Sequence, residues 1–205
     1  MASDIDDKKV KSVAIILAAG ASVRMGRSKQ LLKIGDESLL RKTIRSVGDS
    51  GVDQTLVVLG SNEQDHRREM IDLPIHVVVN SEWQKGMGSS LKCGVHFVTR
   101  IFPCWEIILV AVCDQPLLTA DHLKKMIKIH QSTKSAIVAS LYSGSPGVPV
   151  LFHRSMYKTL LDMADQQGAK KVIQNQIEAA SLVDFPPGAI DLDTPHDLEK
   201  FLDSR

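Results

Sequence analysis

The sequence lacks the features of membrane, secreted and nucleic-acid-binding proteins. No apolar run approaches the roughly 20 residues needed to span a bilayer, and the polar start, MASDIDDKKVKS, lacks the apolar segment of a signal peptide. Aromatic residues are 4% of the chain and the net charge is +1, which argues against base-stacking platforms and a strongly basic nucleic-acid surface. We therefore expect a cytoplasmic protein that binds neither a membrane nor a nucleic acid.

Cysteine is also scarce. Cys93, Cys104 and Cys113 are an odd number without CxxC spacing, so they predict neither a disulfide framework nor a zinc site. We expect reduced, mostly buried thiols. Cys113 precedes Asp114, but no general base accompanies it, so a buried thiol is favoured over a nucleophile. The seven histidines have no metal-ligand spacing and are interpreted as structural or surface residues.

Short β-branched runs alternate with helical patterns in this chain of 205 residues. The runs are apolar at nearly every position, which indicates strands covered on both faces. They are residues 13–17, 54–59, 75–79, 106–112 and 135–141. This alternation predicts an α/β fold of three layers, with a mostly parallel, Rossmann-like sheet and helices on both faces. We expect a flexible N-terminal segment, residues 1–11, and a single domain, residues 12–205.

Capping residues predict where the helices begin. They are Ser38, Asn62, Ser89 or Ser90, Thr119 and Thr194. After residue 141, a stretch rich in glycine, proline and serine predicts a turn, followed by a short strand, VLF, and helices at 155–163 and 168–177. Pro195 and Asp197 complete a capping box for the final helix.

The stretch LAAGASVRMGRSK follows the first predicted strand, where ligands bind in open α/β sheets. Its glycine spacing matches neither GxxxxGK[ST] nor GxGxxG, which disfavours a P-loop hydrolase. Its small residues let the backbone present N–H groups to phosphate oxygens, while Arg24 and Lys29 supply charge. The alternative is a solvated basic turn. The residues expected around the phosphates are Leu17, Ala18, Ala19, Gly20, Ala21 and Ser22.

Two acidic positions could hold a metal ion. Asp114 follows an apolar strand, and a carboxylate at that edge suits Mg²⁺; the alternative is an aspartate that caps the next turn. Asp193, with Asp191 two residues earlier, is the second candidate. Because side chains alternate along an extended segment, only one of these two can face the cleft, and we favour Asp193. Its alternative role is in the N-terminal cap of the final helix.

The stretch NSEWQKGMGSS combines small residues with a helix start, which suits contacts to a base and ribose. An ordinary glycine loop with a serine cap is the alternative. The candidate residues are Asn80, Gly86, Gly88, Ser89 and Ser90. Residues 145–149, SPGVP, could line an acceptor pocket or form a structural turn.

The segment LAAGASVRMGRSK resembles the LAxGxSxRMGxxK signature of the MobA-like nucleotidyltransferases. Four further segments, NSEWQKGMGSSLKCG, CDQPLLT, GSPGVPVLF and DLDTPHDL, resemble motifs of the molybdenum cofactor cytidylyltransferase branch, in the same order, up to residue 198. Two positions depart from the family pattern. Ser81 replaces a proline, and residues 166–170, QQGAK, replace a GDxGAR-like segment. The second departure weakens the inference about the acceptor substrate more than the inference about the reaction.

The resemblance implies a fold of the nucleotide-diphospho-sugar transferase type and a Mg²⁺-dependent transfer of CMP from CTP to the phosphate of molybdopterin, with release of pyrophosphate. It implies that Arg24 and Lys29 are catalytic, and that a molybdenum hydroxylase is a transient partner that receives the product. Nothing in the residues distinguishes CTP from GTP. The alternatives are molybdopterin guanylyl transfer, a sugar or polyol phosphate acceptor, and a chaperone that holds the cofactor without chemistry.

Overall fold

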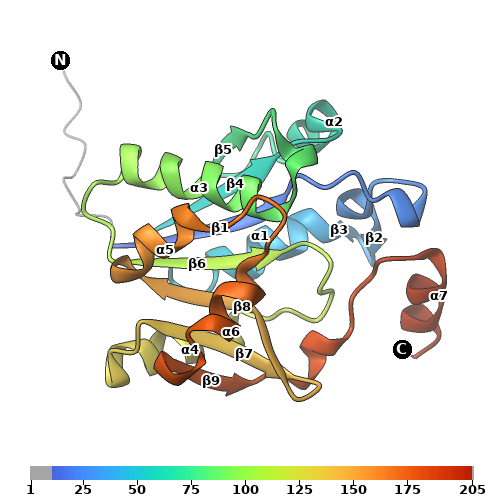
Figure 1. Cartoon of the computed structure of the whole chain (residues 1–205). Helices are drawn as coiled ribbons and strands as arrows, with labels where there is room; N and C mark the ends of the chain where they lie inside the picture. The colour runs from blue at the N-terminus through green and yellow to red at the C-terminus, as the bar shows by residue number, and fades with distance from the viewer. Residues whose placement is uncertain (1–10, 205) are drawn as a thin grey trace.

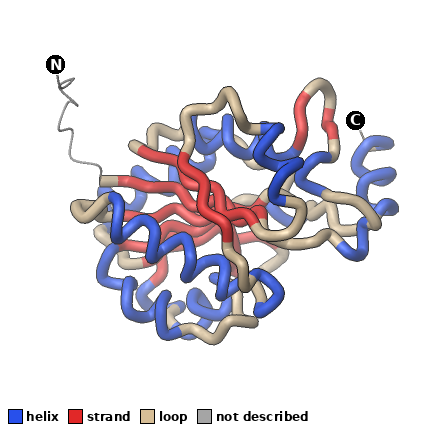
Figure 2. The backbone as a smooth tube through the Cα atoms, turned by 90° about the horizontal axis from the view of Figure 1, so that it is seen from above, coloured by secondary structure: helices blue, strands red, loops and turns tan. Residues whose placement is uncertain are grey.

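The computed structural model describes residues 11–204. The segment expected to be flexible, residues 1–11, lies outside the described residues except for Lys11. The described part contains one seven-stranded sheet, in the order β5-β4-β1-β6-β8-β7-β9, with helices on both faces (Figure 1; Figure 2). Its strands are β1 (Ser12–Ala18), β4 (Gln54–Leu59), β5 (His76–Val79), β6 (Ile107–Val112), β7 (Ile137–Tyr142), β8 (Ser145–His153) and β9 (Ala180–Asp184).

The sheet is mostly parallel, as predicted. β1 pairs in parallel with β4 and β6, and β7 with β9, whereas β8 runs antiparallel to both of its neighbours. The expected short strand VLF is wrong in extent, because β8 has nine residues and includes most of the stretch predicted as a turn. Ser143 and Gly144 adopt positive φ angles and make the reversal between β7 and β8 within two residues.

Two hydrophobic layers enclose the sheet because successive side chains of each strand point to opposite faces. On β1, Val13 and Ile15 face the layer that contains α3, whereas Ala14 and Ile16 face the layer that contains α1 and α4. All four side chains are fully buried. The helices are α1 (Leu39–Gly48), α2 (Glu63–Glu69), α3 (Met87–Ile101), α4 (Ala120–Thr133), α5 (Tyr157–Asp162), α6 (Ala169–Asn175) and α7 (Pro195–Asp203).

A third, smaller core lies beside the sheet. It joins α7 to the hairpin of β2 (Lys33–Ile34) and β3 (Glu37–Ser38), and Figure 1 shows α7 at the edge of the molecule next to this hairpin. Its buried residues are Met25, Leu32, Ile34, Leu39, Leu192, Leu198 and Phe201. This core therefore fastens the C-terminal segment to the chain that follows β1.

Most predicted helix starts are confirmed. The hydroxyls of Ser38 and Thr119 accept hydrogen bonds from backbone N–H groups of the first turns of α1 and α4. Thr194 and Asp197 form the expected capping box of α7. Asn62 precedes α2, but its side chain caps nothing there.

The predicted start of α3 is wrong. The helix begins at Met87 after Gly86, so Ser89 and Ser90 lie inside the first turn. Their hydroxyls accept hydrogen bonds from the Nδ2 atom of Asn80 instead of capping the helix. No helix among residues 11–204 is long and apolar enough to cross a membrane.

Candidate active site

A cleft of about 310 Å³ lies at the carboxyl ends of β1 and β6, where the parallel sheet was expected to bind its ligand. The loops after β1, β5 and β6 form its walls. Seven of the residues predicted from the sequence line it, namely Leu17, Ala19, Gly20, Lys29, Gly86, Ser90 and Asp114. Trp83 lines it as well, and its side chain packs against the backbone at Gly60.

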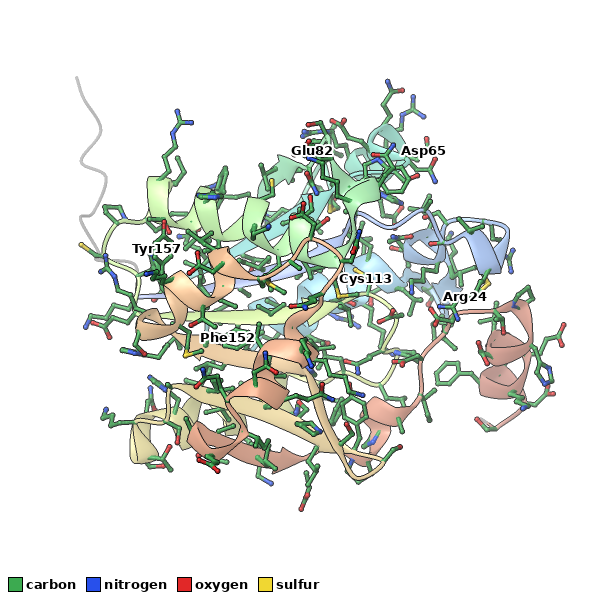
Figure 3. All side chains as sticks on the ribbon, viewed as in Figure 1. Arg24, Asp65, Glu82, Cys113, Phe152 and Tyr157 are labelled. Atoms are coloured by element: carbon green, nitrogen blue, oxygen red, sulfur yellow. The ribbon has the colours of Figure 1, made fainter. Side chains whose placement is uncertain are left out.

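Lys29 lies between two carboxylates. Its Nζ atom donates to Asp114 Oδ2 at 2.6 Å and to Asp193 Oδ1 at 2.9 Å. The three side chains are 18%, 21% and 32% exposed, so the cluster is partly buried. Arg24, which is 72% exposed, approaches the other oxygen of Asp193 at 2.7 Å, and Figure 3 shows it beside the segment that leads into α7. The structure thus brings together four of the predicted charged residues.

The charges of the cluster shift its pKa values. Burial lowers the pKa of Lys29, but the two carboxylates outweigh burial and raise it above its usual value. Lys29 and Arg24 hold the pKa of Asp193 below its usual value, although burial acts in the opposite direction. Desolvation, followed by the nearby charges of Asp114 and Asp193, raises the pKa of Asp191 to about 6. Asp191 therefore belongs to the same electrostatic cluster as the other acids.

The donor set suits a hard cation that completes its shell with ligands from elsewhere. Within residues 11–204, no three histidine, cysteine, aspartate or glutamate side chains form a metal cage. Asp114 and Asp193 nevertheless direct carboxylate oxygens at one shared positive charge, the ammonium of Lys29. Mg²⁺ in phosphate-binding sites commonly uses one or two carboxylates together with phosphate oxygens and water. The pair fits that pattern.

The turn after β1 is held by Gln30, a residue of the cleft wall that the sequence interpretation missed. Gln30 is only 2% exposed, and its side chain hydrogen bonds to the backbone of Ala18 and Gly20. Ser22 Oγ donates to Gln30 and accepts from the backbone N–H of Lys29, so this hydroxyl is used within the turn. General chemistry indicated that such a residue was needed. When a turn presents its N–H groups to a ligand, its carbonyl groups need hydrogen-bond donors from elsewhere in the protein.

The glycines of the second candidate segment allow another loop to approach. A Cβ atom on Gly86 would lie 2.5 Å from the carbonyl oxygen of Asp165, and one on Gly88 would lie 2.4 Å from that of Ala164. Lys92 strengthens this contact by donating to the carbonyl of Met163 at 3.1 Å and by pairing with Asp165. The loop before α6, which includes residues 166–168 of the unusual sequence QQGAK, is therefore fixed against the start of α3.

Asn80 and Ser89 lie outside the cleft. They border a separate polar cavity with Lys92, and Asn80 braces the loop by accepting from the backbone N–H of Glu82 at 3.0 Å. Ser90, which also bonds to Asn80, reaches the cleft. Asn80 thus supports the position of Ser90 and has no described contact with the charged cluster.

The cysteines differ in exposure. Cys113 is buried in the cleft wall, and burial, followed by the charge of Asp114, raises its pKa to about 12, which agrees with an inert thiol. Cys93 is half-buried. The expectation of mostly buried thiols is wrong for Cys104, which is exposed next to Trp105, where the chain turns into β6.

The predicted acceptor segment, residues 145–149, is part of β8. The amide of Gln115 donates to the carbonyls of Val148 and Gly188, both at 3.1 Å, and so ties β8 to the segment that leads to the C-terminal acids. Tyr142 packs its hydroxyl against Gly147. Burial, followed by the charge of Asp191, raises the pKa of this tyrosine. The segment therefore lies on the acidic side of the site.

Comparison with known proteins gives a consistent assignment. Residues 14–180 match the family model described as the MobA-like NTP transferase domain. The chain is similar to the purine catabolism protein PucB of Bacillus subtilis, with 25% identity over 199 residues that cover 91% of this chain and 94% of PucB. It is 31% identical over 138 residues to nicotine blue oxidoreductase of Paenarthrobacter nicotinovorans, covering 65% of this chain and 64% of that protein.

Solved structures show the same fold. The crystal structure of Rv0371c from Mycobacterium tuberculosis superposes with a TM-score of 0.80 and 25% identity, covering 95% of this chain and 99% of that chain. A complex of Rv0371c with manganese superposes with a TM-score of 0.75 and 24% identity, covering 95% and 100%. The acids Asp191 and Asp193 follow the last residue of the family match.

Proposed function

The chain belongs to the MobA-like NTP transferase family and has the α/β fold of nucleotide-diphospho-sugar transferases; from this premise we propose that it transfers CMP from CTP to the phosphate of molybdopterin and releases pyrophosphate. The general activity, nucleotidyl transfer, comes with the family. The choice of CTP and of a molybdopterin acceptor is supported by the five sequence motifs that resemble the cytidylyltransferase branch. We also propose that the protein acts in the cytoplasm and hands its product to a molybdenum hydroxylase.

The charged cluster is the observation that carries the proposal. Lys29, Asp114 and Asp193 converge within hydrogen-bonding distance although 85 and 164 positions separate the lysine from the two acids. A solvated basic turn would leave Lys29 in water, whereas this lysine is held at the rim of a cleft. Such an arrangement of cations, carboxylates and small-residue backbone suits a triphosphate with its divalent ion.

The chemistry needs alignment more than proton transfer. An oxygen of the acceptor phosphate attacks the α-phosphorus of the triphosphate, a P–O bond forms there, and the bond to pyrophosphate breaks. The acceptor oxygen is already anionic, so no side chain has to remove a proton. Catalysis then consists of holding the reactants in line and neutralising the charge that accumulates on the leaving group.

Each part of the site has a role in this step. Backbone N–H groups of residues 19–22 would bind phosphate oxygens, and Arg24 and Lys29 would neutralise the α- and γ-side oxygens. Asp114 and Asp193 would hold Mg²⁺, which neutralises phosphate charge when it is bound. The manganese complex of Rv0371c supports a divalent ion in this fold. Asp191 would add negative potential to that position.

The test is product analysis. The protein is incubated with Mg²⁺, molybdopterin and either CTP or GTP, and the products are identified by mass. We expect the CMP adduct and pyrophosphate from CTP, and a reduction of about a hundredfold or more in Asp114→Asn. Asp121→Asn, an exposed acid on α4, is the matched control and should retain full activity.

Other outcomes decide between the alternatives. A GMP adduct would indicate guanylyl transfer, and turnover only with a sugar or polyol phosphate would identify a different acceptor. If no acceptor yields pyrophosphate, or if Asp114→Asn releases pyrophosphate at the rate of the unmodified protein, the proposed mechanism is wrong. The first of these results favours a chaperone that binds the cofactor.

A further inference from the structure

Gln30 makes every hydrogen bond that a glutamine side chain can make. Its Nε2 atom donates to the carbonyls of Gly20 at 3.0 Å and Ala18 at 3.3 Å. Its Oε1 atom accepts from Ser28 Oγ at 2.9 Å and Ser22 Oγ at 3.0 Å. Two N–H donors and two lone pairs are thus satisfied, and the two carbonyl acceptors fix which end of the amide is nitrogen.

These bonds set the direction of the peptide groups in the turn. In a trans peptide unit the carbonyl of one residue and the N–H of the next point in opposite directions. The peptide bonds of this turn are trans. The carbonyls of Ala18 and Gly20 face Gln30, so the N–H groups of Ala19 and Ala21 point away from it. Ala19, Gly20 and Gln30 all line the cleft, so the direction of these N–H groups is set at the cleft wall itself.

The same amide fixes the approach of the catalytic lysine. Gln30 follows Lys29 directly, and Ser22, which donates to Gln30, also accepts the backbone N–H of Lys29 at 3.1 Å. The start of the turn and the residue that reaches the two carboxylates are therefore joined through one buried side chain. Movement of Gln30 would displace both.

A histidine on α2 supports the amide. His66 is fully buried, and its Nε2 atom lies 2.7 Å from Ser28 Oγ. Because the single hydroxyl proton of Ser28 is donated to Gln30, the hydrogen of this contact must come from His66 Nε2. The Nδ1 atom of His66 is buried without a hydrogen-bond partner in the described structure, which agrees with a neutral ring protonated on Nε2.

We propose that Gln30 is the positioning residue of the phosphate-binding turn, and that His66 holds it in place through Ser28. The amide fixes the direction of the N–H groups that would bind the polyphosphate, and it sets Lys29 at the carboxylates. This inference rests on the proposed function, because it takes the ligand of the turn to be the triphosphate of the nucleotide. The amide of Gln30 is fully used by hydrogen bonds within the turn, and His66 acts only through Ser28, so both residues are assigned a positioning role.

The first test replaces Gln30 with methionine, which has a similar shape but no N–H or carbonyl group. Binding of inorganic triphosphate and of cytidine is measured in the presence of Mg²⁺, together with the unfolding midpoint. We expect triphosphate binding to weaken by about tenfold to a hundredfold, because small misplacement of binding groups has effects of that size. Cytidine has no phosphate, and its affinity should change by less than about twofold.

The second test replaces His66 with glutamine or asparagine. The side-chain amide of each of these residues lies near the position of one ring nitrogen of the histidine. His66→Gln places an N–H near the position of Nε2 and should keep triphosphate affinity within about threefold of the unmodified protein. His66→Asn places its amide near Nδ1, loses the bond to Ser28, and should weaken binding by about tenfold. This pair still tests the proposal if the methionine variant fails to fold.

The outcomes separate this inference from the proposed function. Equal triphosphate affinity in Gln30→Met, equal loss of cytidine and triphosphate, or equal affinities of the two His66 variants would overturn the positioning role. So would an unmodified protein that binds no triphosphate. If the unmodified protein binds triphosphate but forms no nucleotidyl product, the proposed function fails, and the effect of Gln30 on binding remains measurable.

Discussion

Protonation of His122 should destabilise the protein as the pH falls. His122 is buried on α4, its ring stacks on Phe185 at 4.1 Å with an angle of 17°, and its Nε2 atom lies 2.8 Å from Ser140 Oγ. Burial, followed by the positive charge of Lys125, lowers its pKa to about 4. Phe185 begins the segment that leads to the C-terminal acids.

The size and sign of the effect follow from linkage. The pKa of His122 is about 4 in the folded protein and near 6.5 in the unfolded chain, so the unfolded chain binds more protons between these values. The stability is therefore complete above about pH 6.5 and is lost as the pH falls toward 4. Between about pH 7 and about pH 5 the loss is about 2 kcal/mol.

Urea denaturation of the unmodified protein and His122→Gln at about pH 7 and about pH 5 measures this loss. Glutamine keeps an N–H near Ser140 but does not titrate in this range. The lowered pKa values of His66 and His153 act in the same direction as His122, and the raised pKa of Asp191 acts in the opposite direction. Both proteins share these groups, so they cancel in the comparison.

We expect the free energy of unfolding of the unmodified protein to fall by about 2 kcal/mol more than that of His122→Gln over this interval. A difference below about 0.5 kcal/mol would refute the reasoning, because it would mean that the folded protein admits a charged imidazole at no cost.

Three further predictions concern the site. Gly88→Ala should lower the free energy of unfolding by about 1–3 kcal/mol, because the loop packed on Gly88 must move. Gly48→Ala is the control, since a Cβ atom there meets nothing within 4 Å, and equal midpoints of the two variants in thermal denaturation would contradict the expectation. Arg24→Ala should change stability by less than about 1 kcal/mol but reduce nucleotidyl transfer by about tenfold or more in the pyrophosphate assay, with Arg27→Ala as the control that keeps activity. Cys113 should not react with a thiol reagent until the protein unfolds, whereas the other two cysteines react in the folded protein. Mass spectrometry measures the modification of each cysteine, and early modification of Cys113 would disprove its burial.

The central strands could be predicted from the sequence because they are buried on both faces. The run that became β6 is apolar at every position of the strand, and the run that became β4 is apolar after its first two residues. The predicted bounds of both strands agree with the structure to within one residue. β8 could not be predicted in full, because its first half contains Gly147 and two prolines. Those residues are tolerated there through pairing with β7, which is a property of the folded chain.

The charged residues of the site were predictable, but the groups that hold them were not. Lys29, Asp114 and Asp193 stand in motifs whose residue types already indicate phosphate and metal chemistry. Gln30 has no such signature, since its importance depends on which backbone carbonyls lie next to it after folding. The contact between Gly88 and the loop before α6 is hidden for the same reason, because it joins segments that are distant in sequence.

The small core under α7 has a consequence for how a change far from the cleft can reach it. Leu192 is fully buried in this core beside Leu198 and Phe201 of α7, and it directly precedes Asp193. A substitution that loosens the packing of α7 would therefore let Asp193 move away from Lys29, whereas Asp114, which follows β6, would keep its position. One of the two carboxylates could thus be lost through a helix that contributes no residue to the cleft wall.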